Sequence, residues 1–338
     1  MEFIRRRLGL IFRALVSVLL IAFLIRKVDW PKLCVILRTV NVEWLIVGAG
    51  CFLPVLLIVS WRWRMLLSVH GVRMHFWRIF ELTMIGQFFS AFLLGTTGGD
   101  VIKIFYVARA VPKHRAAVSF TVIVDRVIGM VALLLFGVAL SVTQLPLLLS
   151  TPGAKFYTGL FYLLALGGVV VSVLGSVGPL FLRHQAVRSL LERIPFIHRG
   201  KSLIAAYEKS AQALGINVLA LIASVPSHMC ILLVGYCVMR AMHLTVPLLP
   251  FCSVLAMVNM LIALPISVSG FGVREWLFGT FLGLLHIDWN HAIAFSLTYF
   301  AVNLLWSLTG GPFYFLYRHE THTPPPNVAE VEPIFSER

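Results

Sequence analysis

The stretch that decides the fold is LLGTTGGDVIK at residues 93–103, where a glycine-rich break is followed by an acid–base pair inside an apolar sequence. Charged groups and irregular backbone are both costly in hydrocarbon, so a region that combines them lines a cavity or is wrapped in protein. A second break of the same character, LPISVSGFGVRE, occupies residues 264–275. We therefore expect two broken helical segments to organise the chain.

The composition places the chain in a membrane. Of its 338 residues, 59% are hydrophobic and 12% are charged, whereas about a quarter of the residues of a soluble domain are charged. The net charge of +14 is compatible with nucleic-acid binding, but the basic residues cluster just beyond apolar segments, as topology signals do. The pattern predicts an all-α polytopic membrane protein whose partners are membrane lipids and not nucleic acid.

The five cysteines offer no redox or metal site by their spacing. They lie mostly within apolar runs, and no CxxC pair occurs among Cys34, Cys51, Cys230, Cys237 and Cys252. We interpret them as small hydrophobic residues. No metal ion and no cofactor is expected to bind the chain.

Apolar runs long enough to cross a membrane predict about six full spans. They cover residues 1–27, which we take to be uncleaved, and residues 42–60, 116–142, 157–182, 216–242 and 292–317. Residues 79–94 are too few to cross about 30 Å of hydrocarbon at about 1.5 Å per residue. Together with residues 101–110 they predict a re-entrant hairpin, and residues 248–264 and 276–285 predict a second one. Eight crossings are the alternative.

Three other segments are expected at the membrane surface or outside it. Trp61, Arg62, Trp63 and Arg64 alternate aromatic rings with guanidinium groups, which is typical of interfacial anchors. Residues 183–214 form a basic, partly amphipathic connection that is expected to lie along the membrane. The tail at 319–338 is expected to be short and disordered. The distribution of Lys and Arg predicts that both termini are cytoplasmic.

The spacing of these elements predicts one transmembrane domain, residues 1–318, made of two similar halves. Residues 1–145 and 150–318 would each hold two spans, a hairpin and a third span. Three crossings per half is an odd number, so the second half would be inserted upside down relative to the first. Chance similarity among apolar segments is the alternative.

The two breaks supply groups that favour an anion. Helix N-termini inside the membrane offer unpaired backbone N–H groups and a positive dipole end, and glycine lets the backbone approach a ligand closely. The expected lipid-headgroup residues are Gly98, Gly99, Asp100, Lys103, Asp125, Arg126, Gly270, Gly272, Arg274 and Glu275. Alternatively, Asp100 caps its own helix and Glu275 faces the helix dipole, roles that need no ligand.

Asp125 and Arg126 lie inside the 116–142 span. Neighbours in a helix point roughly 100° apart, so each could reach a different hairpin and line a lipid path. A buried ion pair that fixes helix packing is the alternative. His228 is a further polar group within a span, and such residues more often tie helices together than bind a substrate.

At Gly98-Gly99-Asp100, at Asp125-Arg126 and at residues 270–275 the chain resembles the flippase-like integral membrane family that includes the membrane portion of bacterial lysylphosphatidylglycerol synthases. The resemblance covers roughly residues 5–318. It departs from the family pattern mildly: Leu94-Gly95 stands where the family has Pro, Lys103 where it has Arg, and Asp125-Arg126 where it has Glu-Arg. The soluble aminoacyl-transferring domain has no counterpart here, so lysyl transfer by this chain alone is not expected.

The resemblance implies a lipid flippase in the bacterial cytoplasmic (inner) membrane. It would move a phospholipid or a polyprenyl-type lipid between leaflets through an anion site near the midplane. One alternative is a membrane-embedded transferase that acts on a lipid-linked substrate, with Asp100 or Asp125 as base or metal ligand, although no paired-carboxylate spacing supports it. The other is a noncatalytic partner of an envelope-biosynthesis enzyme.

Overall fold

The computed structural model describes Arg26 and residues 28–92, 98–182, 197–263 and 270–320. All regular structure in these ranges is helical, which confirms the predicted all-α fold. Five helical segments in them are long and apolar enough to cross a membrane. They are α3 (Val42–Val69), α6 (Arg115–Ser141) with its continuation through η2 (Val142–Gln144) and α7 (Leu145–Leu148), α8 (Pro152–Leu182), α11 (Leu214–Ala241) and α14 (Trp289–Glu320).

These five segments correspond to five of the six predicted spans. The predicted first span, residues 1–27, lies outside the described residues except for Arg26, and most of the predicted tail lies outside them too. The helix α3 begins after Asn41, whose side chain accepts hydrogen bonds from the N–H groups of Glu43 and Trp44. It continues nine residues beyond the predicted end at Ser60, because the Met65-Leu66-Leu67 run keeps packing against the protein.

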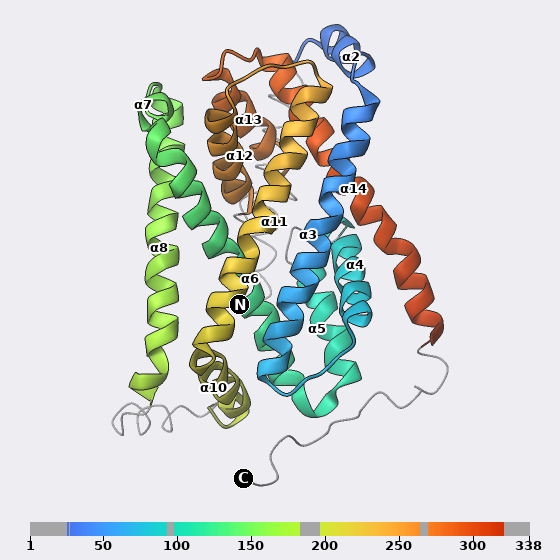
Figure 1. Ribbon diagram of the computed structural model, residues 1–338, viewed down its shortest axis with the longest axis vertical. Helices are drawn as coiled ribbons and strands as arrows, with labels where there is room; N and C mark the ends of the chain where they lie inside the picture. The colour runs from blue at the N-terminus through green and yellow to red at the C-terminus, as the bar shows by residue number, and fades with distance from the viewer. Residues whose placement is uncertain (1–25, 27, 93–97, 183–196, 264–269, 321–338) are drawn as a thin grey trace.

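The shorter helices form two pairs. In the first pair, α4 (Phe76–Phe92) and α5 (Gly98–Ala110) lie in the lower half of Figure 1, and α5 returns to the lower end through η1 (Pro112–His114). In the second, α12 (Leu248–Ala263) and α13 (Val273–Gly283) lie in the upper half, near the start of α14. The breaks themselves, residues 93–97 and 264–269, lie outside the described residues. Hairpins at opposite ends are what two inverted halves would require, and the repeat stays a prediction.

The second pair is more deeply enclosed than the first. It carries much of the larger apolar core, in which Phe251 of α12, Phe278 and Phe281 of α13 and Phe295 of α14 are fully buried. The first pair belongs to a smaller core with the end of α3 and the start of α6. Around these pairs, α8 stands at the edge of the bundle in Figure 1 and exposes most of its apolar side chains. Two surface helices, α2 (Trp30–Arg38) and α10 (Ile197–Gln212), lie at the upper and lower ends.

Close backbone approach holds the first pair together. A Cβ atom on Gly99 of α5 would lie well inside 3.0 Å of the carbonyl oxygen of Gly86 on α4 and of the Ser90 hydroxyl oxygen. A Cβ atom on Gly310 of α14 would meet the carbonyl oxygen of Met84 on α4 in the same way. Small residues at helix contacts allow such packing in membranes, where the lipid supplies no hydrophobic force to press helices together.

We expect Gly99→Ala to destabilise the protein, because the added methyl group must push α4 and α5 apart, at a cost of about 1–3 kcal/mol. The matched control is Gly167→Ala on α8, where an added Cβ atom has nothing within 4 Å and alanine favours the helix. Thermal unfolding in detergent measures both. Equal midpoints for the two variants would contradict this account of the first pair.

Candidate functional site

Five charged side chains from three helices gather among the spans. Arg62 comes from α3, Asp100 and Lys103 from α5, and Asp125 and Arg126 from α6. We call these five residues the charge cluster. Arg62 lies seven residues from the lower end of α3 and Asp125 ten residues from the lower end of α6, which is about 10–15 Å along the helices. The charge cluster is therefore nearer the lower ends of these helices than their upper ends.

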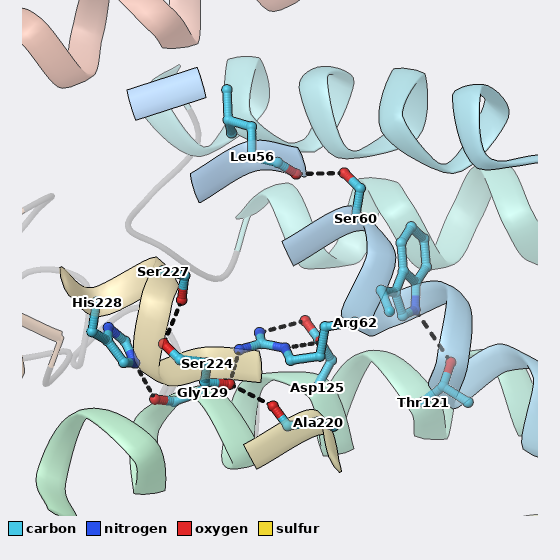
Figure 2. Close-up of polar contacts among 11 residues, drawn as sticks. Leu56, Ser60, Arg62, Thr121, Asp125, Gly129, Ala220, Ser224, Ser227 and His228 are labelled. Carbon is cyan, nitrogen blue, oxygen red and sulfur yellow. Dashed lines mark hydrogen bonds and ion pairs between the residues drawn. The ribbon is translucent and has the colours of Figure 1, made fainter. Parts of the chain in front are cut away.

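The most buried contact of the charge cluster joins Arg62 to Asp125. The Nε atom of Arg62 lies 2.7 Å from Oδ1 of Asp125, and Nη2 lies 3.1 Å from Oδ2, as Figure 2 shows. The third guanidinium nitrogen, Nη1, donates to the Ser224 hydroxyl on α11 at 2.7 Å. The two charged side chains are 6% and 12% exposed. A two-pronged, fully engaged pair of this kind can persist in an apolar interior, and it ties α3, α6 and α11 together.

A more open ion pair joins Arg126 to Asp100. Nη1 of Arg126 lies 2.5 Å from Oδ2 of Asp100, and the two side chains are 28% and 29% exposed. This contact links α6 to the first helix pair. These two side chains are more exposed than those of Arg62 and Asp125.

Asp125 and Arg126 are thus directed to different helices. The sequence left open whether each reaches a different hairpin or the residues form a buried ion pair. Arg126 does reach the first helix pair, whereas Asp125 reaches α3 and not the second pair. The 100° turn between helical neighbours explains why the two separate.

Lys103 brings a third cation to the charge cluster. Its Nζ lies 5.4 Å from the centre of the Trp63 ring, which favours a cation over its face. Its stem passes Gly86, where a Cβ atom would lie 2.6 Å from Cε. Lys103 interacts electrostatically with both carboxylates and both guanidinium groups, but it forms no ion pair within 4 Å in the part of the chain that the structure describes. The charge cluster thus combines three basic side chains, Arg62, Lys103 and Arg126, with the two carboxylates of Asp100 and Asp125.

The structure corrects the interfacial assignment of Trp61-Arg62-Trp63-Arg64. Trp61 and Arg64 are exposed, as expected of anchors, but Arg62 and Trp63 are buried. Sequence reasoning therefore missed Arg62 as a member of the charge cluster. A signal was present, because four consecutive residues cover a full helical turn of about 3.6 residues and cannot all face the lipid headgroups.

The residues after the second break form a closed network. Gly270 and Gly272 adopt φ values of 78° and 83°, which glycine tolerates best. The backbone N–H of Gly272, the N-cap residue of α13, donates to Oε2 of Glu275 at 2.8 Å, which is the N3 half of a capping box. This contact matches the alternative interpretation of Glu275, in which it serves its own helix.

Arg274 takes part in the same network through Nε and Nη2. It forms an ion pair with Glu275, its Nε donates to the Ser296 hydroxyl on α14 at 3.0 Å, and its guanidinium carbon lies 4.2 Å from the centre of the Phe300 ring. The side chains of Arg274 and Glu275 are 6% and 7% exposed. Because this buried ion pair also bonds to Ser296 of α14, the network fastens α13 to α14.

The remaining predicted site residues lie at the start of α5. Gly98 begins α5, and Gly99 is buried against α4, so the missing side chain of Gly99 serves helix packing. Asp100 lies in the first turn of α5 and points its carboxylate to Arg126. Both Asp100 and Asp125 are occupied by guanidinium groups, which gives no support to a base or a metal ligand. In the described ranges, no three His, Cys, Asp or Glu side chains gather as a metal site would require.

Comparison with protein-family models matches residues 10–311 to a family described as the lysylphosphatidylglycerol synthase TM region. The matched range contains both helix pairs and the whole charge cluster. No curated protein matches the chain, and no solved structure matches it.

Removing one partner of the Arg62–Asp125 pair should destabilise the protein by about 3–5 kcal/mol, because the other charge is left buried without a counter-charge. We expect Arg62→Leu and Asp125→Leu to show this loss singly and the double variant to recover most of it. Chemical unfolding in detergent measures the four states of the cycle.

The exposed pair of Lys32 and Asp288 is the matched control, since its side chains are 48% and 43% exposed. Removing Lys32 there should change stability by about 1 kcal/mol or less. Additive losses in the Arg62/Asp125 cycle would show that the two side chains do not depend on each other.

Proposed function

The chain belongs to the lysylphosphatidylglycerol synthase transmembrane-region family, and from this premise we propose that it is a lipid transporter. It is a multi-pass membrane protein of a family with lipid-related function. The transported molecule in our proposal is a phospholipid or a polyprenyl-type lipid with a phosphate group. It moves between the leaflets of the bacterial cytoplasmic membrane.

The observation that carries the proposal is Lys103, a buried amine near both ion pairs that is in no ion pair within 4 Å among the described residues. A cation without a counter-charge is costly among membrane spans. A lipid phosphate provides the missing negative charge and accepts several strong hydrogen bonds at once. Lys103 contributes a compact cation, and Arg126 contributes a planar fork that matches phosphate oxygens.

The two ion pairs have different roles in this proposal. The Arg62–Asp125 pair is buried and holds α3, α6 and α11 as a scaffold. The Arg126–Asp100 pair is accessible, so an arriving phosphate exchanges with Asp100 on Arg126, and Asp100 turns to Lys103 three residues along α5. This exchange releases α5 from α6, and the first helix pair becomes the moving element of the transporter.

The distribution of charge supports a cytoplasmic lower end in Figure 1. Basic residues on segments at that end include Arg64, Arg73, Arg78, Arg109, Lys113, Arg115, Arg199, Lys201 and Lys209. The upper segments carry fewer, namely Lys32, Arg38, Lys155 and Arg240. By the positive-inside rule the lower end faces the cytoplasm. The charge cluster then lies closer to the inner leaflet and receives the headgroup from that side. Together with the predicted span at residues 1–27, this arrangement would leave both termini in the cytoplasm.

Lys103→Met tests the proposal because it separates transport from stability. We expect lipid movement to slow at least tenfold, since a loss of about 1.4 kcal/mol in phosphate binding already gives that factor. Thermal stability should stay the same or rise, because an intramembrane cation without a close carboxylate is removed and methionine keeps an unbranched stem. The measurement is dithionite quenching of fluorescent phosphatidylglycerol in proteoliposomes.

Lys155→Met is the matched control, because Lys155 is exposed at the upper end of α8, and empty liposomes give the background rate. The proposal fails if wild-type protein moves lipid no faster than empty liposomes. The assignment of Lys103 fails if a well-folded Lys103→Met variant moves lipid at the wild-type rate.

A further inference from the structure

We propose that His228 on α11 takes up a proton and couples lipid movement to proton movement. This inference rests on the proposed transport function and adds its energy source. His228 is four residues after Ser224, so both side chains lie on the same face of α11. Ser224 accepts the hydrogen bond from Nη1 of Arg62. In Figure 2, His228 and Ser224 lie on α11, where Ser224 bonds to Arg62 of the Arg62–Asp125 pair and His228 bonds to Gly129 of α6.

Gly129 of α6 connects His228 to Arg62 physically. Its carbonyl oxygen lies 3.1 Å from Nε2 of His228. A Cβ atom on Gly129 would lie 3.2 Å from both Nη1 and Nη2 of Arg62. The imidazole and the guanidinium group therefore both adjoin the same residue, and the charge of one is felt by the other.

The hydrogen bond to Gly129 assigns the proton on the neutral ring. A carbonyl oxygen can only accept, so Nε2 carries the hydrogen and Nδ1 carries a lone pair. Nδ1 is buried and has no hydrogen-bond partner among the described residues. A proton can therefore add to Nδ1 without breaking any contact that His228 makes. The proton comes from water, bonds to the Nδ1 lone pair and converts imidazole to imidazolium.

The surrounding charges make proton uptake depend on the anion. From α3 the cation of Arg62 faces His228, and from α6 the carboxylate of Asp125 is already neutralised by Arg62. The described residues of α12 and the span of α14 from Ala292 to Leu316 carry no charged side chain. On α11 itself the nearby ionisable group is Cys230, a neutral thiol.

The charges of α10 are remote from His228. Asn217 of α11 donates to the carbonyl oxygen of Ser210 on α10, and His228 lies eleven residues further along, about 16 Å. A positive charge on His228 is unfavourable, first because the ring is buried and also because the cation of Arg62 is near, until a lipid phosphate enters the charge cluster. By linkage, the phosphate favours the proton and the proton favours the phosphate to the same degree. One proton and one lipid of charge −1 then move together with no net charge.

The test uses proteoliposomes with fluorescent phosphatidylglycerol, a pH difference of one unit across the membrane, and the membrane potential clamped. For one proton per lipid, the ratio of labelled lipid between leaflets shifts tenfold in wild type, since one pH unit corresponds to a factor of ten. His228→Gln keeps a donor for Gly129 but cannot take up a proton. We expect it to move lipid while the ratio no longer responds to pH.

The control is His243→Gln, because His243 is exposed and its Nε2 also lies beside a backbone carbonyl oxygen, that of Thr39. It should keep the tenfold shift. A second readout uses the wild-type protein and a pH-sensitive dye inside the vesicles. The dye should report proton movement when labelled lipid is added. This measurement does not depend on whether His228→Gln folds.

The outcomes separate the two proposals. Lipid movement that ignores the pH difference overturns proton coupling and leaves the transport function intact. A pH-dependent ratio that persists in His228→Gln assigns the coupling elsewhere and overturns the role of His228. No lipid movement under any condition overturns the transport function, and the coupling with it.

Discussion

The buried pair of Arg62 and Asp125 is the contact on which the rest of the site depends. Its two nearly parallel hydrogen bonds satisfy the carboxylate, and the hydroxyl of Ser224 satisfies the remaining guanidinium nitrogen. Three spans are thereby fixed in rotation as well as position, because each must present one polar side chain to the same point. Once α6 is fixed in this way, its next residue, Arg126, must point toward α5.

The two helix pairs differ in how completely their charges are used. In the second pair, Arg274 and Glu275 neutralise each other, and an aromatic core surrounds them. In the first, the Asp100–Arg126 pair is partly exposed and Lys103 adds a cation. The sequence predicts that the halves are inverted repeats with a similar order of helices. Even so, the charged contacts of the two helix pairs differ. We infer that the second helix pair stays fixed and that the first helix pair responds to a bound ligand.

The sequence predicted the spans well because their length and hydropathy depend on the bilayer, which acts on every segment in the same way. It did not predict which face of each helix points into the protein. A membrane span is apolar on all sides, so periodicity does not reveal an inward face as it does in a soluble protein. Arg62 was therefore assigned to the interface, although its partner Asp125 lies 63 residues away. Gly99 was expected beside a headgroup for a similar reason, whereas it packs on the backbone of Gly86.

The order of the two partners along the chain has a consequence for biosynthesis. Arg62 is translated 63 residues before Asp125, which at typical rates is roughly 3–13 s. During that interval α3 carries a guanidinium group without its carboxylate. Arg62 is near the lower end of α3, so its long side chain can extend to the lipid headgroups while it waits. The neighbouring Trp61 and Arg64 remain exposed in the finished protein. The aromatic–arginine signature thus describes where the nascent helix rests before α6 arrives and draws Arg62 inward.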